Sequence, residues 1–373
     1  MTDPIALTII ATGALVGASA ALLGCFLVLR GAAMVTDAIS HSVLFGIVVV
    51  WLMTGATSGA VQLLGAAAAG LLTVVLSEAL TRTRLVAQDA AIGLVFPALF
   101  AAGVLIINIH ARDVHLDADA VLLGQIGLVW LDTVALGAWE VPRAPLTLGL
   151  VLVVNLGFVL ALWKELKLAT FDPGLAAALG CAPGLVFHLL LGLTSATAVA
   201  SFDAVGAVLF VAFAIIPPAT AYLLTERLSR MVALAVALSL AASVLGYALA
   251  FAWNVSIGGM MATVSGAGFA LALLAGPRRG LVAGVLARRR ERRMAACRTL
   301  VAHLWSHRDG PEAEEENTAR ALQEHLHWSA VEAGRIILAA HDAGLIRREA
   351  GLLALTGRGE AEARTVLRIP ARD

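Results

Sequence analysis

The stretch LRGAAMVTDAISHSVLFG, residues 29–46, joins two long apolar runs. Asp37 and His41 within it are four residues apart, which places them on one face of a helix with Cβ atoms about 5–6 Å apart. An acid and a histidine beside a membrane are costly unless they are paired, hydrated or bound to a ligand. The pair is therefore a candidate functional site.

The composition is that of an integral membrane protein. Of the 373 residues, 60% are hydrophobic and 14% are charged, and the mean hydropathy is +0.89. Soluble domains carry about 25% charged residues. Residues 5–29 exceed the roughly 20 apolar residues that cross a bilayer, and residues 1–4 lack the basic flank of a signal peptide. We expect residues 5–29 to form the first transmembrane helix.

The distribution of charged residues differs between the first three quarters of the chain and the last quarter. Residues 1–277 contain two Lys, seven Arg and thirteen acids, whereas residues 278–373 contain seventeen Arg and thirteen acids. This distribution predicts a transmembrane domain over 1–279 and a small cytoplasmic domain over 294–373. Between them, residues 280–293 are predicted to form a basic juxtamembrane linker that rests on anionic lipid of the bilayer.

Nine apolar runs are separated by junctions, and every second junction is basic. The positive-inside rule then predicts nine spans, an external N-terminus and a cytoplasmic C-terminus. If run 1 or run 2 is not a true span, the count is eight and the N-terminus lies inside. Run 2 is short, so residues 31–41 are predicted to be its in-plane or helical lead-in. The runs are 5–29, 42–55, 57–80, 90–109, 146–164, 183–200, 204–224, 231–251 and 257–276, and the basic junctions contain Arg30, Arg82, Arg84, Lys164, Lys167, Arg227, Arg230, Arg278 and Arg279.

The longest external segment covers residues 110–145. Its apolar part, Val121–Gly137, is broken by polar residues and glycines, which predicts an interfacial or re-entrant helix. Immediately before it stand His115, Asp117 and Asp119. They suit an external metal funnel or a contact with a binding protein, and an ordinary solvated loop explains them equally well.

Two further segments carry helix-ending signals. In residues 164–180, Asp172 is placed to cap a short cytoplasmic helix, Pro173 to begin it and Gly180 to stop it. This helix is either a docking element for a partner or a plain loop helix. Pro217 and Pro218 interrupt the seventh run and predict a helix break within the membrane, as in the discontinuous helices of transporters.

The tail is predicted to form a small α+β domain. Helices over Thr318–Leu326 and Ser329–Ala343 precede two short strands within 344–356, and a last helix begins at Gly357. A helix–turn–helix followed by a hairpin is a winged helix. The predicted fold class is thus an all-α polytopic membrane protein of eight or nine transmembrane helices with a small cytoplasmic winged-helix domain.

Histidines of the tail invite a metal interpretation. They form two close pairs, His303/His307 and His325/His327. Because no third ligand lies at a diagnostic spacing, solvated or core histidines are the favoured interpretation.

Several catalytic motifs are absent from the sequence. The only lysines are Lys164 and Lys167, and neither stands in a P-loop, so the chain cannot cradle ATP phosphates in that way. There is no H-E-x-x-H, no G-x-S-x-G and no chain of intramembrane acids typical of a proton-coupled carrier. We expect no enzyme activity in the chain itself. Cys25, Cys181 and Cys297 form no C-x-x-C and are interpreted as inert packing residues.

Five segments carry short motifs whose order is specific: Leu29–Gly46, Asp89–Gly93, His115–Gly124, Trp163–Lys167 with Phe171–Pro173, and Ile216–Ala221. Together they resemble the membrane permeases of the ABC-type manganese/zinc/iron uptake family, over about residues 5–279. The tail, through Leu355, Thr356 and Gly359, resembles the winged-helix part of iron- and manganese-dependent regulators of the diphtheria-toxin-repressor type. The metal ligands of those regulators cannot be matched in this chain.

The resemblance implies an ATP-driven importer of divalent metal in the bacterial plasma (inner) membrane. Two permease chains, identical or paralogous, would form the pathway, an extracytoplasmic metal-binding protein would deliver the ion, and no cofactor would be bound permanently. Asp37 and His41 would handle transported Mn²⁺ first, then Fe²⁺ or Zn²⁺; the alternative is a structural Asp–His hydrogen bond. Two cytoplasmic ABC ATPases would dock on the coupling residues, which are Lys164, Glu165, Phe171, Asp172, Pro173 and Gly180.

Two other functions remain open at this stage. The first is a membrane-tethered winged-helix regulator that binds DNA. The tail has an excess of only four basic residues, seventeen minus thirteen, which is small for phosphate neutralisation, so we do not expect a nucleic-acid partner. The second is a gradient-driven carrier, which would take up metal without an ATPase.

Overall fold

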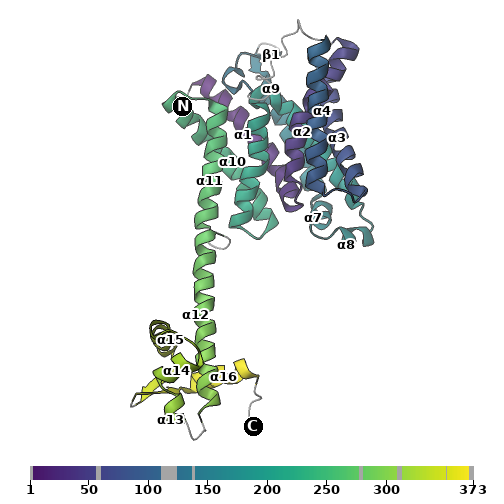
Figure 1. The fold of residues 1–373 in the computed structure, drawn as a ribbon. Coiled ribbons are helices and arrows are strands. Elements are labelled where there is room, and N and C mark those ends of the chain that lie inside the picture. Colours follow the sequence, from purple (N-terminus) through teal and green to yellow (C-terminus); the bar gives the residue numbers. More distant parts are fainter. Residues whose placement is uncertain are drawn as a thin grey trace. The chain divides into compact units, whose positions relative to one another are not determined.

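The computed structural model of the chain describes residues 3–55, 60–110, 124–136, 139–276, 280–308, 313–349 and 351–368. It contains two compact units, Met1–Gly280 and Leu281–Asp373. Unit 1 is a bundle of long helices, with a small hairpin at one end and two short helices at the other (Figure 1).

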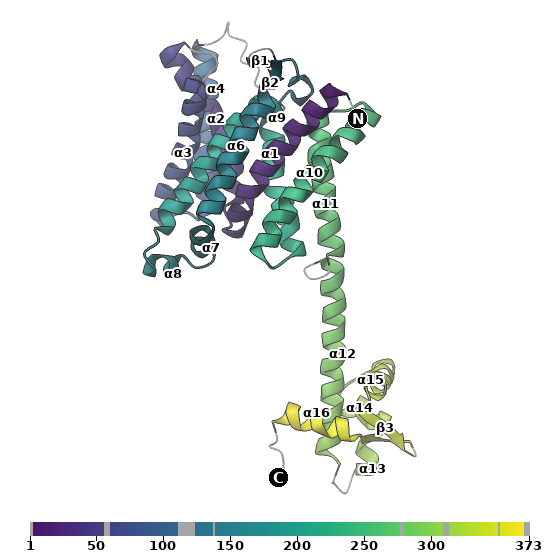
Figure 2. The same ribbon diagram turned by 180° about the vertical axis from the view of Figure 1, so that it is seen from behind.

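Within the described residues, eight helices of unit 1 are long and apolar enough to cross a membrane. They are α1 (Pro4–Leu29), α2 (Ala33–Thr54), α3 (Ala60–Arg82), α4 (Gln88–His110), α6 (Arg143–Ala161), α9 (Pro183–Leu224), α10 (Leu228–Trp253) and α11 (Ile257–Ala275). The helix α1 lies at the centre of the bundle, where α6, α9 and α10 pack against it (Figure 2). The all-helical polytopic fold that the sequence predicted is therefore confirmed.

The helix α9 contains a reversal. Its 42 residues would extend about 63 Å if straight, twice the thickness of the hydrocarbon core. Gly206 interrupts it with φ 72° and ψ 170°, a conformation essentially confined to glycine. Near the start of α9, the Phe187 ring lies 4.1 Å below the guanidinium of Arg30. Near its end, Ala221 packs beside Cys25 of α1.

Both ends of α9 therefore lie beside the same end of α1, and the chain turns back at Gly206. The two halves correspond to the apolar runs 183–200 and 204–224, which the sequence predicted as separate spans. Because α9 passes through the bundle twice, the eight long helices of the described residues cross the bundle nine times.

The predicted break at Pro217 and Pro218 is wrong, because both prolines lie inside helical α9 and the interruption stands at Gly206. A proline lacks the N–H that would bond the carbonyl four residues earlier, so Pro218 frees the carbonyl of Ala214. Gly24 of α1 lies directly against that carbonyl, where a Cβ atom would overlap it. Cover by a neighbouring helix lets the proline remain within a continuous span.

Two other expectations concern the ends of the bundle. The second span begins at Ala33, so the lead-in to the short second run is helical. The predicted interfacial helix over Val121–Gly137 is wrong in its described part, which holds the 3₁₀ turn η1 (Ile126–Leu128) and the strand β1 (Thr133–Leu136). That strand pairs with β2 (Trp139–Pro142) in an antiparallel hairpin, which pairs backbone groups of a segment whose glycines disfavour a helix.

Unit 2 has its own hydrophobic core, which includes Leu300, Leu304, Leu322, Ile337 and Leu353. The two helices, the hairpin and the last helix lie where the sequence predicted them. Residues 281–293, expected to be a linker, belong to α12. The elements are α12 (Leu281–Ser306), α13 (Ala313–Glu316), α14 (Ala319–His325), α15 (Ala330–Asp342), β3 (Ile346–Glu349), β4 (Leu352–Leu355) and α16 (Gly357–Leu367).

Candidate functional site

Asp37 and His41 lie in the second and third turns of α2. The Asp37 Oδ1 and His41 Nε2 atoms are 3.6 Å apart, and the side chains are 34% and 33% exposed. The His41 ring stacks on Phe96 of α4 with centroids 5.6 Å apart and meets the edge of Phe100 at 6.0 Å. The imidazole is thus positioned by aromatic packing, while the pair itself is looser than a hydrogen bond.

The position of the pair along α2 follows from the helix rise. Asp37 and His41 stand four and eight residues after Ala33, which is about 6 Å and 12 Å along the axis. They therefore lie inside the span, in the half of α2 nearest to Arg30, and not in a separate lead-in.

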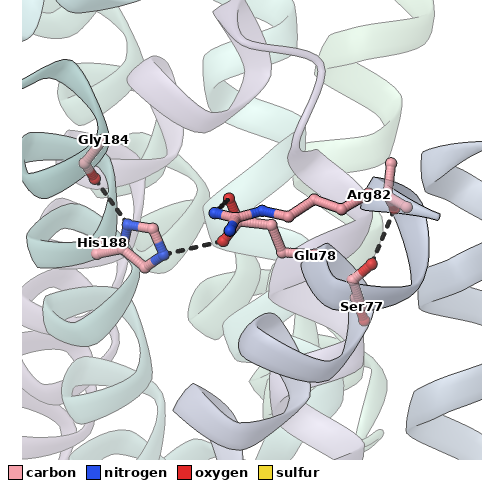
Figure 3. Close-up of polar contacts among 6 residues, drawn as sticks. Ser77, Glu78, Arg82, Gly184 and His188 are labelled. Atoms are coloured by element: carbon pink, nitrogen blue, oxygen red, sulfur yellow. Dashed lines mark hydrogen bonds and ion pairs between the residues drawn. The ribbon is translucent and has the colours of Figure 1, made fainter. Parts of the chain in front are cut away.

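A second acid–histidine pair, missed by the sequence analysis, joins α3 to α9 (Figure 3). Glu78 Oε1 accepts a hydrogen bond from Arg82 at 2.9 Å, and Glu78 Oε2 lies 3.0 Å from His188 Nε2. The other ring nitrogen of His188 lies 2.7 Å from the carbonyl oxygen of Gly184. Only the Glu78–Arg82 spacing is visible in the sequence, since His188 is 110 residues away from its acid.

The predicted capped helix is confirmed as α8 (Pro173–Ala178), which follows α7 (Trp163–Phe171). The Asp172 side chain accepts a hydrogen bond from the Leu175 N–H at 2.9 Å, Pro173 is the first helical residue, and Gly180 follows with φ +83°. Lys164 and Glu165 lie in the first turn of α7.

One face of α7 and α8 is apolar and exposed. Leu166, Ala169 and Ala176 are buried on the bundle side. The opposite face presents three large, exposed apolar side chains: Phe171 at 60%, Leu175 at 47% and Leu179 at 66%. We call these three residues the α7–α8 patch.

The remaining predicted site residues are placed as follows. Pro217 and Pro218 are buried in α9, where the second of them faces Gly24 of α1. His115, Asp117 and Asp119 lie outside the described residues.

Known proteins match most of unit 1, and one of the matches extends into the tail. Residues 2–276 match the ABC 3 transport family. The chain is 42% identical over 344 residues to a zinc transport system membrane protein, TroD, of Treponema pallidum, covering 92% of this chain and 94% of that protein. It is 46% identical over 275 residues to the manganese transport system membrane protein MntD of Bacillus subtilis, covering 74% and 93%.

A solved structure is also similar. PsaBC from Streptococcus pneumoniae, determined in complex with a Fab, aligns with a TM-score of 0.62 at 27% sequence identity, covering 74% of this chain and 94% of the matched chain. The family match ends at residue 276, so the winged-helix assignment of the tail stays a prediction.

Proposed function

The chain belongs to the ABC 3 transport family, and from this premise we propose that it forms the translocation pathway for a divalent transition metal, Mn²⁺ first, then Fe²⁺ or Zn²⁺. It is a multi-pass membrane protein and the permease subunit of an ABC transporter. It is not itself an enzyme, since ATP hydrolysis in such transporters belongs to a separate ATPase.

The observation that carries the metal assignment is the Asp37–His41 pair. A carboxylate and an imidazole suit borderline divalent ions, and neither residue is a thiolate that would hold a soft metal tightly. The two side chains sit 3.6 Å apart and supply only part of a coordination shell, which leaves the other positions to water. Such partial coordination fits a site that must release its ion.

The direction of transport is inferred from charge. Arg30, Arg82 and Lys164 all lie at the bundle end that carries α7 and α8, and basic residues favour the cytoplasm. We therefore propose that this end faces the cytoplasm, that the C-terminus is cytoplasmic and that the membrane is the bacterial plasma membrane. The opposite end, which includes the segment with His115, Asp117 and Asp119, would receive metal from an extracytoplasmic binding protein.

The α7–α8 patch supports the docking of an ATPase. Three large apolar side chains on a short capped element at the cytoplasmic end form a surface for a hydrophobic groove on a partner. A pair of ATPases would dock on this region, which contains Lys164, Glu165, Phe171, Asp172, Pro173 and Gly180. A second permease chain, identical or paralogous, would complete the pathway.

The DNA-binding alternative is weaker. A membrane-tethered regulator does not account for the match of residues 2–276 to a transport family. It would also need phosphate neutralisation by a tail with an excess of only four basic residues, seventeen minus thirteen.

Uptake of ⁵⁴Mn²⁺ into proteoliposomes tests the proposal. The chain would be reconstituted with its ATPase and binding protein, with ATP on the ATPase side. We expect uptake that stops when the ATPase carries a catalytic substitution, and that unlabelled Mn²⁺ suppresses better than Fe²⁺ or Zn²⁺. Uptake that persists without the ATPase would instead establish a gradient-driven carrier, and an absence of uptake with any of the three metals would reject the metal assignment.

A further inference from the structure

Four side chains that can bind metal converge in unit 2. His303 and His307 lie one turn apart on α12 with ring centroids 4.7 Å apart. Glu316 is the last residue of α13, and one donor atom from each of these three residues lies within 4.8 Å of the others. His325, at the end of α14, places Nδ1 at 2.6 Å from Glu316 Oε2, and its ring lies 5.9 Å from that of His303.

The Glu316 carboxylate has an unsatisfied oxygen. Its Oε2 atom is buried and accepts no aligned hydrogen bond, although His325 Nδ1 is close enough in distance to donate one. A buried polar atom without a bond is costly and uncommon in folded proteins. Here the Glu316 carboxylate lies beside the rings of His303, His307 and His325, an environment that a cation would complete.

His303 is half-buried within this cluster. Burial lowers the pKa of His303 from its ordinary value of 6.5, a hydrogen bond to the Glu316 backbone opposes this shift, and the neighbouring His307 lowers the pKa further.

We propose that His303, His307 and Glu316, with His325 as the fourth ligand, bind one divalent transition metal ion in the C-terminal unit. The ligand set is imidazole nitrogen and carboxylate oxygen, so binding should strengthen from Mn²⁺ to Co²⁺ and should be strong for Zn²⁺. Ligand atoms about 2.0–2.1 Å from a tetrahedral ion are about 3.3 Å apart. The present separations of up to 4.8 Å among His303, His307 and Glu316 would close by small rotations of these partly buried side chains, and a rotation of the more exposed His325 would bring in the fourth ligand.

This site lies beyond the proposed transport function. All four residues stand after residue 276, where the family match ends, and none belongs to a transmembrane helix. The sequence analysis set these histidines aside because it found no third ligand; the structure supplies Glu316, nine residues after His307 and too far for any diagnostic spacing.

Metal titration of the purified full chain in detergent tests the site. Zn²⁺ and Co²⁺ would be added after chelator treatment, with His41→Gln in every sample so that the transport pathway contributes little. We expect one ion per chain in unit 2 and a visible Co²⁺ absorption typical of four-coordinate binding. Removal of a ligand in His307→Gln or Glu316→Gln should weaken affinity by about tenfold or more, since even outer-shell changes cost 10- to 100-fold.

His327→Gln is the matched control, because His327 is exposed and lies outside the cluster; it should bind as the parent does. Far-UV circular dichroism would establish that Glu316→Gln, a near-isosteric change, leaves unit 2 folded. Equal affinity in the parent and in the His307→Gln and Glu316→Gln variants would overturn the proposal.

Discussion

Two acid–histidine pairs lie at the same end of the helical bundle, but their carboxylate oxygens and ring nitrogens differ in how fully they are hydrogen-bonded. In Glu78–His188, both carboxylate oxygens and both ring nitrogens have partners within 3.0 Å, and Arg82 is one of them. In Asp37–His41, the two groups are 3.6 Å apart on a single helix. Within the described residues, neither of these two side chains forms a hydrogen bond with another group, and no arginine pairs with Asp37.

The difference supports our proposal that one pair is a structural contact and the other handles metal. A metal takes lone pairs that hydrogen bonds would otherwise occupy, so a saturated pair resists coordination and a loose pair permits it. We therefore assign Glu78–His188 to the attachment of α3 to α9, and Asp37–His41 to the transport pathway. Substitutions in each pair test this assignment, because those in the pathway should reduce uptake and those in the structural contact should reduce stability.

The largest expected effect follows removal of a side chain that we propose to bind metal in the pathway. His41→Gln and Asp37→Asn should each reduce ⁵⁴Mn²⁺ uptake by about 10- to 100-fold, by analogy with the loss of groups around a metal. Both side chains are about one-third exposed and loosely paired, so the melting temperature in detergent should change by no more than about 2 °C, equivalent to roughly 1 kcal/mol.

His341→Gln serves as the control for these variants, since His341 is exposed in unit 2 and uptake should remain at the parental level. If His41→Gln transports normally, the Asp37–His41 pair is a structural contact and the comparison between the two pairs fails.

A smaller effect, on stability instead of uptake, is expected for the second pair. Glu78→Gln removes the charge that links Arg82 to His188 and should lower stability by about 1 kcal/mol, or about 2 °C in melting temperature. Uptake should fall by less than about threefold, far below the effect at His41. Intrinsic tryptophan fluorescence during heating and ⁵⁴Mn²⁺ uptake would measure the two quantities on the same preparation.

Glu140→Gln is the control here, because Glu140 is an exposed glutamate on β2 at the other end of the bundle and should change neither quantity. Loss of uptake in Glu78→Gln without a change in melting temperature would move this pair into the pathway.

The features that the sequence predicted correctly are those with local causes. Apolar runs and basic junctions located the spans, because hydropathy and charge act over some 20 residues. Asp172, Pro173 and Gly180 located α8, because a cap, an N1 proline and a left-handed glycine specify a helix within a few positions. Helix and strand patterns located the elements of unit 2.

The features that it missed depend on partners distant in sequence or on tertiary cover. Pro217 and Pro218 looked like a break because the sequence does not show Gly24 covering the freed carbonyl of Ala214. The reversal stands instead at Gly206, a glycine like many others in the chain. At the candidate sites, Asp37 and His41 were found because they are four residues apart, whereas the His188 partner of Glu78 and the Glu316 partner of the tail histidines come from other elements.

The smallest expected effect is that of replacing Arg82, which donates a hydrogen bond to Glu78 of the Glu78–His188 pair. Arg82 is 75% exposed on its side chain, so solvent screens its attraction to Glu78, and Arg82→Gln should cost at most about 0.5 kcal/mol. The Glu78–His188 contact would remain and α3 would stay attached to α9, so the melting temperature should fall by less than half as much as in Glu78→Gln. An equal loss in both variants would mean that Arg82, and not His188, accounts for the stabilising effect of Glu78. The contact between helices would then be incidental, and the structural role assigned to His188 would be lost while that of Asp37–His41 would be unaffected.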